Sequence, residues 1–235
     1  MSLISLGLAG MPAPARPATK ESAPDLREYG ATGTSVFGGY LTDTGEYNPE
    51  LTGLAAFRTY ERMRRSDAQV AATLLAMTLP IRSAEWTVQA PREATPVEKE
   101  AADFIREALL EEIDWDGVIS NALLMLPFGC ACHEDVYYID GNRVRVKKLA
   151  PRLPSTFERW LTAPDTQDLA AIEQYGELAG GGWGTATLPS NKIALFTNEC
   201  EGSNWAGRSV LRAAYQHWYI KSSLYKIDAI TQERN

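Results

Sequence analysis

Cysteine, cationic charge and long apolar runs are all scarce in this sequence. Its 235 residues include three Cys, and this low, odd number is typical of a reducing compartment without a disulfide framework. Lys and Arg number 23 against 30 Asp and Glu, which gives a net charge of -7. Tight DNA binding by counterion release needs a basic stripe, so the charge balance excludes that class but not loose passage of DNA.

Signals for export, membrane insertion and nucleotide binding are also missing. The N-terminus, MSLISLGLAG, has a short apolar run but no basic residue before it, unlike a signal peptide. No apolar run approaches the roughly 20 residues needed to cross a bilayer, which predicts a soluble protein without membrane contact. The glycine run of residues 180–184 lacks the Gly-Lys-Ser/Thr ending of a phosphate loop, so we expect a flexible loop there and no nucleotide cofactor.

What is present predicts a folded α+β protein. A hydrophobic fraction of 45% and six Trp can supply a core for one large or two small domains. Residues 1–46, rich in Pro, Gly, Ala, Ser and Thr, indicate a flexible N-terminal arm. Residues 47–206 mix helical and strand periodicities, and residues 207–235 contain nothing that breaks a helix.

Helix start signals and alternating patterns place the expected elements within residues 47–206. Four helices are expected. The first runs from the Asn48-Pro49 start to Arg65, and the second begins at a Ser66 N-cap, has Val70, Leu74, Leu75 and Met77 on its apolar side, and stops at Pro80. The third starts at Pro96, and the fourth has an Asp114 N-cap and runs to Pro127 and Gly129. Strands are expected at 86–90, 156–161, 170–174 and 193–197, and as a hairpin around Asp140-Gly141-Asn142.

The stretch FGCACHEDVYY (residues 128–138) raises the question of a metal site or a cysteine nucleophile. Neighbouring side chains of a strand face opposite ways, which places Cys130 and Cys132 on one face and His133 on the other. One zinc ion cannot then take all three ligands, and the imidazole cannot reach either thiol. We therefore expect packed thiols and neither a metal nor a catalytic residue. A Cys-dependent hydrolase is the remote alternative.

The final stretch, GRSVLRAAYQHWYIKSSLYKIDAITQERN, predicts one helix of about 40 Å. Leu211, Tyr215, Trp218 and Tyr225 share one stripe, while other apolar residues lie off it, so several sides need covering, by the chain's own domain or by other subunits. The chain ends within this pattern without a C-cap Gly or Pro, which is unlike a natural fold end.

An ordered set of motifs resembles the bacteriophage portal proteins, particularly the Mu-type branch, over residues 47–235. The motifs are Met63-Arg-Arg-Ser-Asp-Ala-Gln-Val70, Leu79-Pro-Ile81, Ser83-Ala-Glu-Trp-Thr-Val88, Leu126-Pro-Phe-Gly129 before Glu134-Asp-Val-Tyr137, and Gly207-Arg-Ser-Val-Leu-Arg212 before Glu233-Arg234. Cys130, Cys132 and the N-terminal arm depart from the pattern.

The resemblance implies a virion protein that forms a homo-oligomeric ring, usually of about twelve copies, at one capsid vertex. Double-stranded DNA would pass through the ring, non-specifically, during packaging and ejection. Its partners would be the major capsid protein, the terminase and neck or tail adaptor proteins, with assembly in the host cytoplasm. Lacking an ATP-binding motif, the chain would not itself be the packaging motor.

The resemblance also implies an anatomy for the chain. Residues 47–206 would be the wing, residues 207–235 would lead toward the stem, and the stem, clip and crown would lie outside this chain. Arg208 and Arg212 are candidates for intersubunit ion pairs, and Trp218 and Tyr225 for apolar contacts. Two alternatives stay open: these arginines are ordinary surface residues, or the protein is another phage or cellular assembly adaptor that acts through protein contacts.

Overall fold

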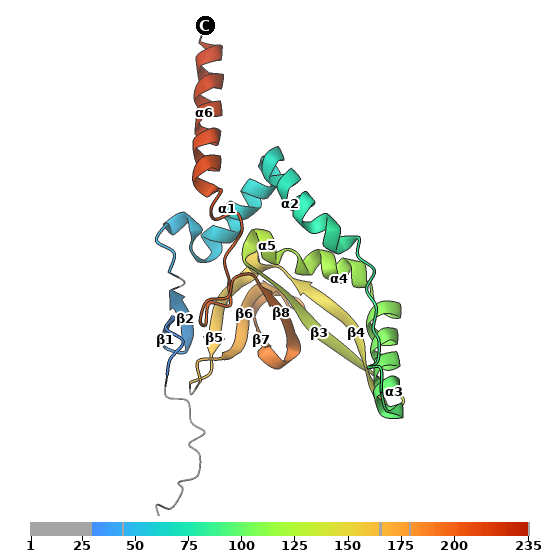
Figure 1. The fold of residues 1–235 in the computed structure, drawn as a ribbon. Helices are drawn as coiled ribbons and strands as arrows, with labels where there is room; N and C mark the ends of the chain where they lie inside the picture. The colour runs from blue at the N-terminus through green and yellow to red at the C-terminus, as the bar shows by residue number, and fades with distance from the viewer. Residues whose placement is uncertain (1–29, 44, 165, 179, 235) are drawn as a thin grey trace, which may run out of the picture. The chain divides into compact units, whose positions relative to one another are not determined.

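Two antiparallel sheets and a set of helices make up the structure, a computed structural model that describes residues 30–43, 45–164, 166–178 and 180–234 (Figure 1). Residues Ala31–Asn235 form one compact unit. The α+β prediction is confirmed. Most of the expected N-terminal arm, residues 1–29, lies outside the described residues, but two short strands occur at its far end. The division into arm, wing and stem-directed helix remains a prediction.

The helices and strands follow one another along the chain with few long loops. In order they are β1 (Ser35–Phe37), β2 (Tyr40–Asp43), α1 (Gly53–Ser66), α2 (Ala68–Arg82), α3 (Pro96–Arg106), α4 (Trp115–Ala122), α5 (Met125–Phe128), β3 (Cys130–Asp140), β4 (Arg143–Arg152), β5 (Phe157–Thr162), β6 (Leu169–Glu177), β7 (Trp183–Pro189), β8 (Ile193–Thr197) and α6 (Tyr215–Glu233).

The strands form a five-stranded sheet of order β1-β2-β5-β6-β7 and a three-stranded sheet of order β4-β3-β8. The predicted hairpin is confirmed: Asp140 pairs with Arg143, and Gly141 turns the chain with a φ of 59°. The glycine run predicted as a loop turns the chain from β6 into β7, with Gly181 and Gly182 both at positive φ. The sequence interpretation missed β7 itself, since Trp183 and Gly184 already belong to that strand.

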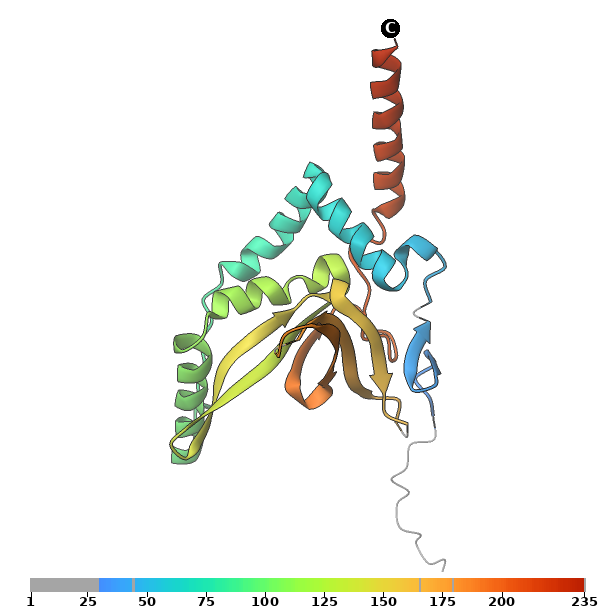
Figure 2. The ribbon, with the colours of Figure 1, turned by 180° about the vertical axis from the view of Figure 1, so that it is seen from behind.

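One apolar core joins α1, the start of β3, the five-stranded sheet and the base of α6. Helix α1 buries Phe57, Tyr60 and Met63, which recur at helical spacing. Ile172 of β6 and Cys130 of β3 are fully buried against the same cluster. Figures 1 and 2 show α1, α4 and α5 along one side of the sheets and α3 beside the tip of the β3–β4 hairpin.

The start and end of the first two helices differ from the prediction. Asn48 caps only a short 3₁₀ turn, and α1 begins after Thr52. Asp67, and not Ser66, is the N-cap of α2: its carboxylate accepts hydrogen bonds from the Gln69 and Val70 amides, while the Ser66 hydroxyl donates to the Arg62 carbonyl.

Pro80 does not stop α2, which continues to Arg82. Only Leu74 of this helix is buried, and the predicted apolar side, including Leu75 and Met77, is largely exposed.

The alternating segment 86–90 has no regular secondary structure and does not form the predicted strand. Among the described residues no strand pairs with it, and the guanidinium of Arg106 donates a hydrogen bond of 3.0 Å to the Val88 carbonyl instead. The Trp86 ring packs edge-on against Trp115 with a centroid distance of 6.0 Å. The alternating side chains therefore pack against α3 and α4. The segment is not a strand, because a strand also needs a backbone partner for hydrogen bonding.

The start of the final helix also differs. Residues 207–209 are irregular, residues 210–214 form turns, and α6 begins at Tyr215. The helix is therefore about 28 Å long instead of the predicted 40 Å. Across the described ranges, every helix is too short or too polar to traverse a bilayer.

Candidate subunit interface at the base of the final helix

The loop that precedes α6 crosses the junction between α5 and β3 at two glycines. A Cβ on Gly129 would lie 2.5 Å from the Ala206 carbonyl oxygen, and one on Gly207 would lie 2.6 Å from that of Asn198. Both residues also have positive φ, 94° and 63°. The Gly-Arg-Ser-Val-Leu-Arg motif thus begins with a glycine because two backbone segments meet there.

Backbone hydrogen bonds fix this loop on both sides of the crossing. The Asn198 amide donates to the Gly129 carbonyl and the Arg208 amide to that of Asn198, each at 2.8 Å. The buried Ser209 hydroxyl donates to the Pro127 carbonyl at 2.6 Å and accepts a bond from the Leu211 amide. The direction in which the chain enters α6 is therefore set by the junction between α5 and β3.

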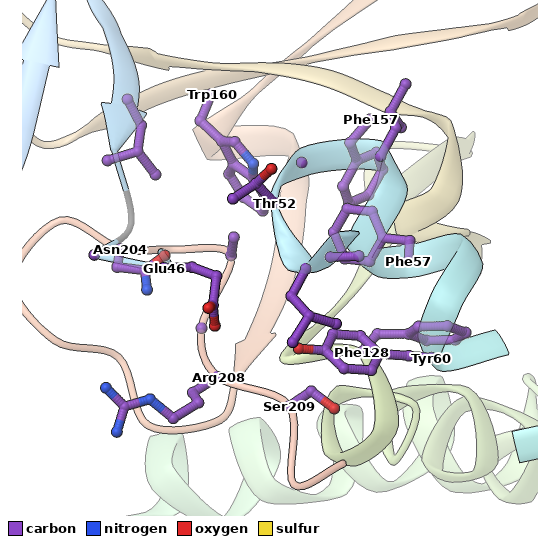
Figure 3. A pocket seen from close by; sticks show the side chains of 18 of the residues that line it. Glu46, Thr52, Phe57, Tyr60, Phe128, Phe157, Trp160, Asn204, Arg208 and Ser209 are labelled. Atoms are coloured by element: carbon purple, nitrogen blue, oxygen red, sulfur yellow. The ribbon is translucent and has the colours of Figure 1, made fainter. Parts of the chain in front are cut away.

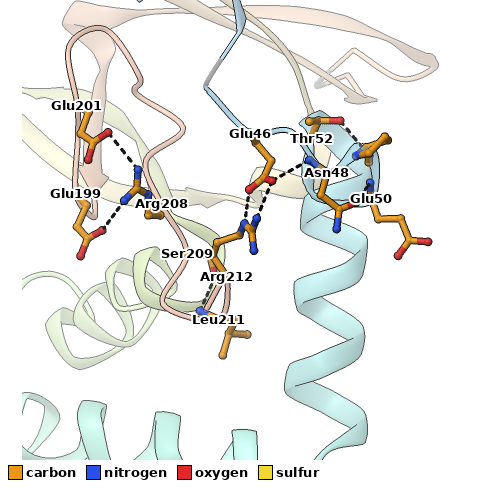
Figure 4. Close-up of polar contacts among 11 residues, drawn as sticks. Glu46, Asn48, Glu50, Thr52, Glu199, Glu201, Arg208, Ser209, Leu211 and Arg212 are labelled. Carbon is orange, nitrogen blue, oxygen red and sulfur yellow. Dashed lines mark hydrogen bonds and ion pairs between the residues drawn. The ribbon is translucent and has the colours of Figure 1, made fainter. Parts of the chain in front are cut away.

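Arg208 and Arg212, predicted to form intersubunit ion pairs, both have acidic partners within the chain (Figure 4). Arg208 lies 3.2 Å from Glu201 and 3.9 Å from Glu199, and about half of its side chain is exposed. Arg212 forms a bidentate pair with Glu46, and its guanidinium lies 5.2 Å from the centre of the Tyr47 ring. These contacts do not test a role between subunits, which stays a prediction.

The contact between Arg212 and Glu46 begins a row of polar contacts at the base of α6. Burial raises the pKa of Glu46, but hydrogen bonds from Arg212 outweigh it and hold that pKa below its ordinary value. One turn further, the Tyr215 hydroxyl donates to Glu50, which raises the pKa of that hydroxyl. Both carboxylates come from the segment just before α1, so this segment holds the start of α6.

Asp67 and Lys221 form the far end of the row, where three helices meet. Asp67 follows α1, caps α2 and accepts an ion pair from Lys221 of α6, with only 4% of its side chain exposed. The hydrogen bond from Lys221 lowers the pKa of the Asp67 carboxyl. We call Arg212–Glu46, Tyr215–Glu50 and Lys221–Asp67 the helix clamp, because together they fix the direction of α6 relative to α1.

Trp218 and Tyr225, the predicted apolar contacts, occupy different environments. Trp218 is 8% exposed and packs in the core of its own chain beside Tyr215. Tyr225 is 68% exposed, and Leu224 and Ile227 beside it are similarly exposed. In Figure 1 this end of α6 has no neighbouring element. Leu211, Tyr215 and Trp218 of the predicted stripe are thus covered within the chain, and Tyr225 is presented outward.

A pocket of about 270 Å³ lies beside the clamp, between α1, β2, β5 and the loop before α6 (Figure 3). Its floor is aromatic, with Phe57, Phe128 and Trp160, and Glu46 lies at its polar side. Asn204 also lines it, and the buried carbonyl oxygen of that side chain has no hydrogen-bond partner among the described residues. None of the residues that line the pocket is a Cys or a His, so it offers no nucleophile and base of that kind.

The cysteine and histidine cluster has the geometry that the strand pattern predicts. Cys130 and Cys132 are buried in the core, and burial raises the pKa of the Cys132 thiol to about 12. His133 faces the other side of the sheet, where its ring lies 5.8 Å from that of Phe196. Both ring nitrogens lack partners among the described residues, and burial lowers the pKa of the imidazole. All three side chains therefore serve packing.

No group of three or more His, Cys, Asp or Glu side chains in the described ranges is placed to hold a metal ion. The three cysteines are free, and Cys200 alone among them is exposed.

The sequence interpretation missed the acidic half of the clamp. Glu46 and Glu50 precede α1 in a stretch without periodicity, so nothing near them in sequence points to α6. Asp67 carried a usable signal, because Asp is as good an N-cap as Ser and directly follows it. Lys221 could have been found by its position one turn beyond Trp218 on the same side of the helix.

A comparison with protein families agrees with the motif order. Residues 57–235, about three quarters of the chain, match the family described as portal protein of Mu bacteriophage. No curated protein matches the chain closely enough to count as a relative. The family match spans α1 through α6 and includes the base of the final helix and the exposed stripe beyond it. The chain therefore belongs to the Mu-type family of bacteriophage portal proteins.

Proposed function

We propose that this chain is a subunit of a ring at one vertex of a phage capsid, through which DNA is packaged and ejected. The observation that carries the proposal is the family match over residues 57–235. In this proposal the protein is part of the virion and assembles in the host cytoplasm. The proposed ring is a homo-oligomer with closed symmetry, and the resemblance to portal proteins implies about twelve copies.

The outer end of α6 supports assembly through protein contacts. Leu224, Tyr225 and Ile227 are each about 60% exposed or more, and such contiguous apolar surface marks an interaction site. Tyr225 is the apolar contact of the proposed subunit interface, and Trp218, two turns earlier on the same side of α6, holds the helix to the core. Arg208, half-exposed between two carboxylates, is the candidate for an ion pair with a neighbouring subunit, and Arg212 orients the helix.

Within this proposal the chain divides into an arm (1–46), a wing (47–206) and the helix that leads toward the stem (207–235). The clamp joins the last part to the other two: Glu50 and Asp67 belong to the wing, and Glu46 is the last residue of the arm. The direction of the stem-directed helix is therefore determined by the wing together with the end of the arm.

The charge balance suits a conduit for double-stranded DNA. A wall that neutralises many phosphates would retain DNA, at a cost that grows with each contact. A net charge of -7 avoids such retention. The major capsid protein, the terminase and neck or tail proteins are the proposed partners, and the role is structural rather than catalytic.

Negative-stain electron microscopy of the protein at its natural length tests the proposal. We expect closed rings with a central hole. A monomer at high protein concentration would refute it. Copurification from infected cells distinguishes a portal subunit from a general assembly adaptor: terminase and neck proteins are expected for the former, and unrelated partners for the latter.

A further inference from the structure

Helix α2 is nearly uncharged and yet almost wholly exposed. Leu74 is its one buried residue, while Leu75 is 54% and Leu79 is 55% exposed. Arg82, at its end, is the only charged residue of the helix. Helices that face water normally carry charged residues there, and contiguous exposed apolar surface marks a binding surface. A helix of this composition is therefore suited to being covered in an assembly.

Five of the exposed residues of α2 lie on one face of the helix. They follow one another at spacings of four, three, four and three residues: Ala68, Ala72, Leu75, Leu79 and Arg82. This is the spacing with which helices pack side by side. The small side chains of Ala68 and Ala72 leave room for large side chains from a partner, and Leu75 and Leu79 offer apolar contact surface. We call these residues the α2 stripe.

Helix α6 carries a second stripe of the same period. Ile220, Leu224, Ile227 and Thr231 follow at four, three and four residues, and the first three are 48%, 59% and 60% exposed. At 100° per residue they lie on the side of α6 opposite Trp218, which is buried in the core. The side of α6 that the chain leaves uncovered is thus also apolar. We call it the α6 stripe.

The two stripes are complementary in size and in charge. The α2 stripe offers two alanines and ends in Arg82, whereas the α6 stripe offers two isoleucines and a leucine beside Asp228. Arg82 has no ion pair among the described residues, and the side-chain partner of Asp228 there is the neutral Gln232. The Asp228 carboxylate beside the α6 stripe and the Arg82 guanidinium at the end of the α2 stripe favour pairing of unlike stripes.

We propose that the α2 stripe of one subunit binds the α6 stripe of the next, so that subunits associate head to tail. The inference rests on the proposed ring. Pairing of unlike surfaces leaves a free α2 stripe at one end of every open chain and a free α6 stripe at the other. Closure into a ring satisfies both. If only one of the stripes paired with its own copy, association would instead stop at a twofold dimer.

Two variants, made in the protein at its natural length, test the proposal. Leu75→Glu with Leu79→Glu places carboxylates in the α2 stripe, and Leu224→Glu with Ile227→Glu places them in the α6 stripe. All four side chains are exposed, so circular dichroism is expected to match the wild type. Matched controls, Gln69→Glu with Ala76→Glu on α2 and Lys226→Glu on α6, alter charge on exposed positions outside the stripes.

Size-exclusion chromatography with light scattering gives the readout. Each stripe variant alone is expected to be monomeric, with association at least about 100-fold weaker because charges would be buried at the contact. An equimolar mixture of the two is expected to give a one-to-one heterodimer and nothing larger, because one intact α2 stripe and one intact α6 stripe remain. The controls are expected to form rings.

Three outcomes overturn the inference while leaving the ring itself standing. Rings from the α2 variant would mean that something other than a neighbouring α6 covers α2. Dimers of the α6 variant alone would mean that α2 pairs with itself, and a mixture that stays monomeric would mean that the intact stripes do not bind each other. If the wild type forms no ring, the proposed function fails first, and that result is distinct from the other three.

Discussion

Asp67 gives the sharpest test of how the final helix is held, because its carboxylate does two separable things. One oxygen caps α2, and the other accepts the ion pair from Lys221. Removal of an N-cap costs about 1 kcal/mol. Since Lys221 is 39% exposed, its pair with Asp67 is partly screened and contributes about 0.5–1 kcal/mol. Asp67→Ala loses both, whereas Asp67→Asn keeps the cap.

Asp67→Ala is therefore expected to destabilise the folded state by about 2 kcal/mol, and Asp67→Asn by no more than about 1 kcal/mol. For a domain of this size, 1 kcal/mol lowers Tm by roughly 2–4 °C, so thermal unfolding followed by circular dichroism resolves the two. A double-mutant cycle with Lys221→Met is expected to give a coupling of about 0.5–1 kcal/mol. An equal loss of stability in Asp67→Asn and Asp67→Ala, or a coupling energy of zero between Asp67 and Lys221, would refute this account of the clamp.

The pH dependence of the same pair has a definite sign. Because Lys221 lowers the pKa of Asp67, the pair contributes fully above the carboxyl's unfolded pKa of about 3.9 and is lost as pH falls through the lower folded pKa. The penalty of Asp67→Asn is therefore expected to stay constant between pH 5 and 8, to shrink as pH falls below the unfolded pKa, and to be lost only below the lowered folded pKa. A penalty that grows as pH falls would contradict the assignment.

Three further predictions concern the core and the crossing. Native thiol titration is expected to label Cys200 quickly and Cys130 and Cys132 only after denaturation, since burial raises the pKa of both; rapid labelling of Cys132 would reopen the enzyme hypothesis. Stability is expected to fall as pH drops below about 6.5, because burial keeps His133 neutral in the folded state while the unfolded chain takes up a proton. In His133→Leu, the free energy of unfolding measured with urea should therefore depend less on pH between pH 5 and 7. An unchanged pH dependence would mean that other groups cause it. Gly207→Ala is expected to lower the free energy of unfolding by more than about 2 kcal/mol, because the new Cβ would meet backbone atoms of two segments at a positive φ. Gly180→Ala is the tolerated control, since a Cβ there has no atom within 4 Å. Equal Tm values for the two variants would refute the close crossing.

The sequence predicts best where one local rule decides the structure. Alternation and an Asp-Gly turn are enough to specify the β3–β4 hairpin, and the same alternation separates His133 from the thiols. Thr95 and Glu98 form a capping box that supports the predicted start at Pro96. In each case, interactions within a few residues determine the outcome.

The prediction from sequence fails where contacts with residues far along the chain determine the local structure. Residues 86–90 alternate like a strand but have no strand partner, and residues 207–214 read as helix but bind Leu126 and Asn198 through their backbone. Glu46 and Glu50 acquire a role only when the fold brings α6 to them. A pattern within one segment cannot show these contacts, because they depend on which other segment the tertiary fold places beside it.

The central claim, a closed ring built from this chain, is tested most directly by native mass spectrometry of the natural-length protein over a range of concentrations. The account predicts two populations, the monomer and a single oligomer of about twelve subunit masses, because closure stabilises the complete ring over its open intermediates. A monomer at every concentration, or a continuous series of open oligomers without a preferred size, would contradict it.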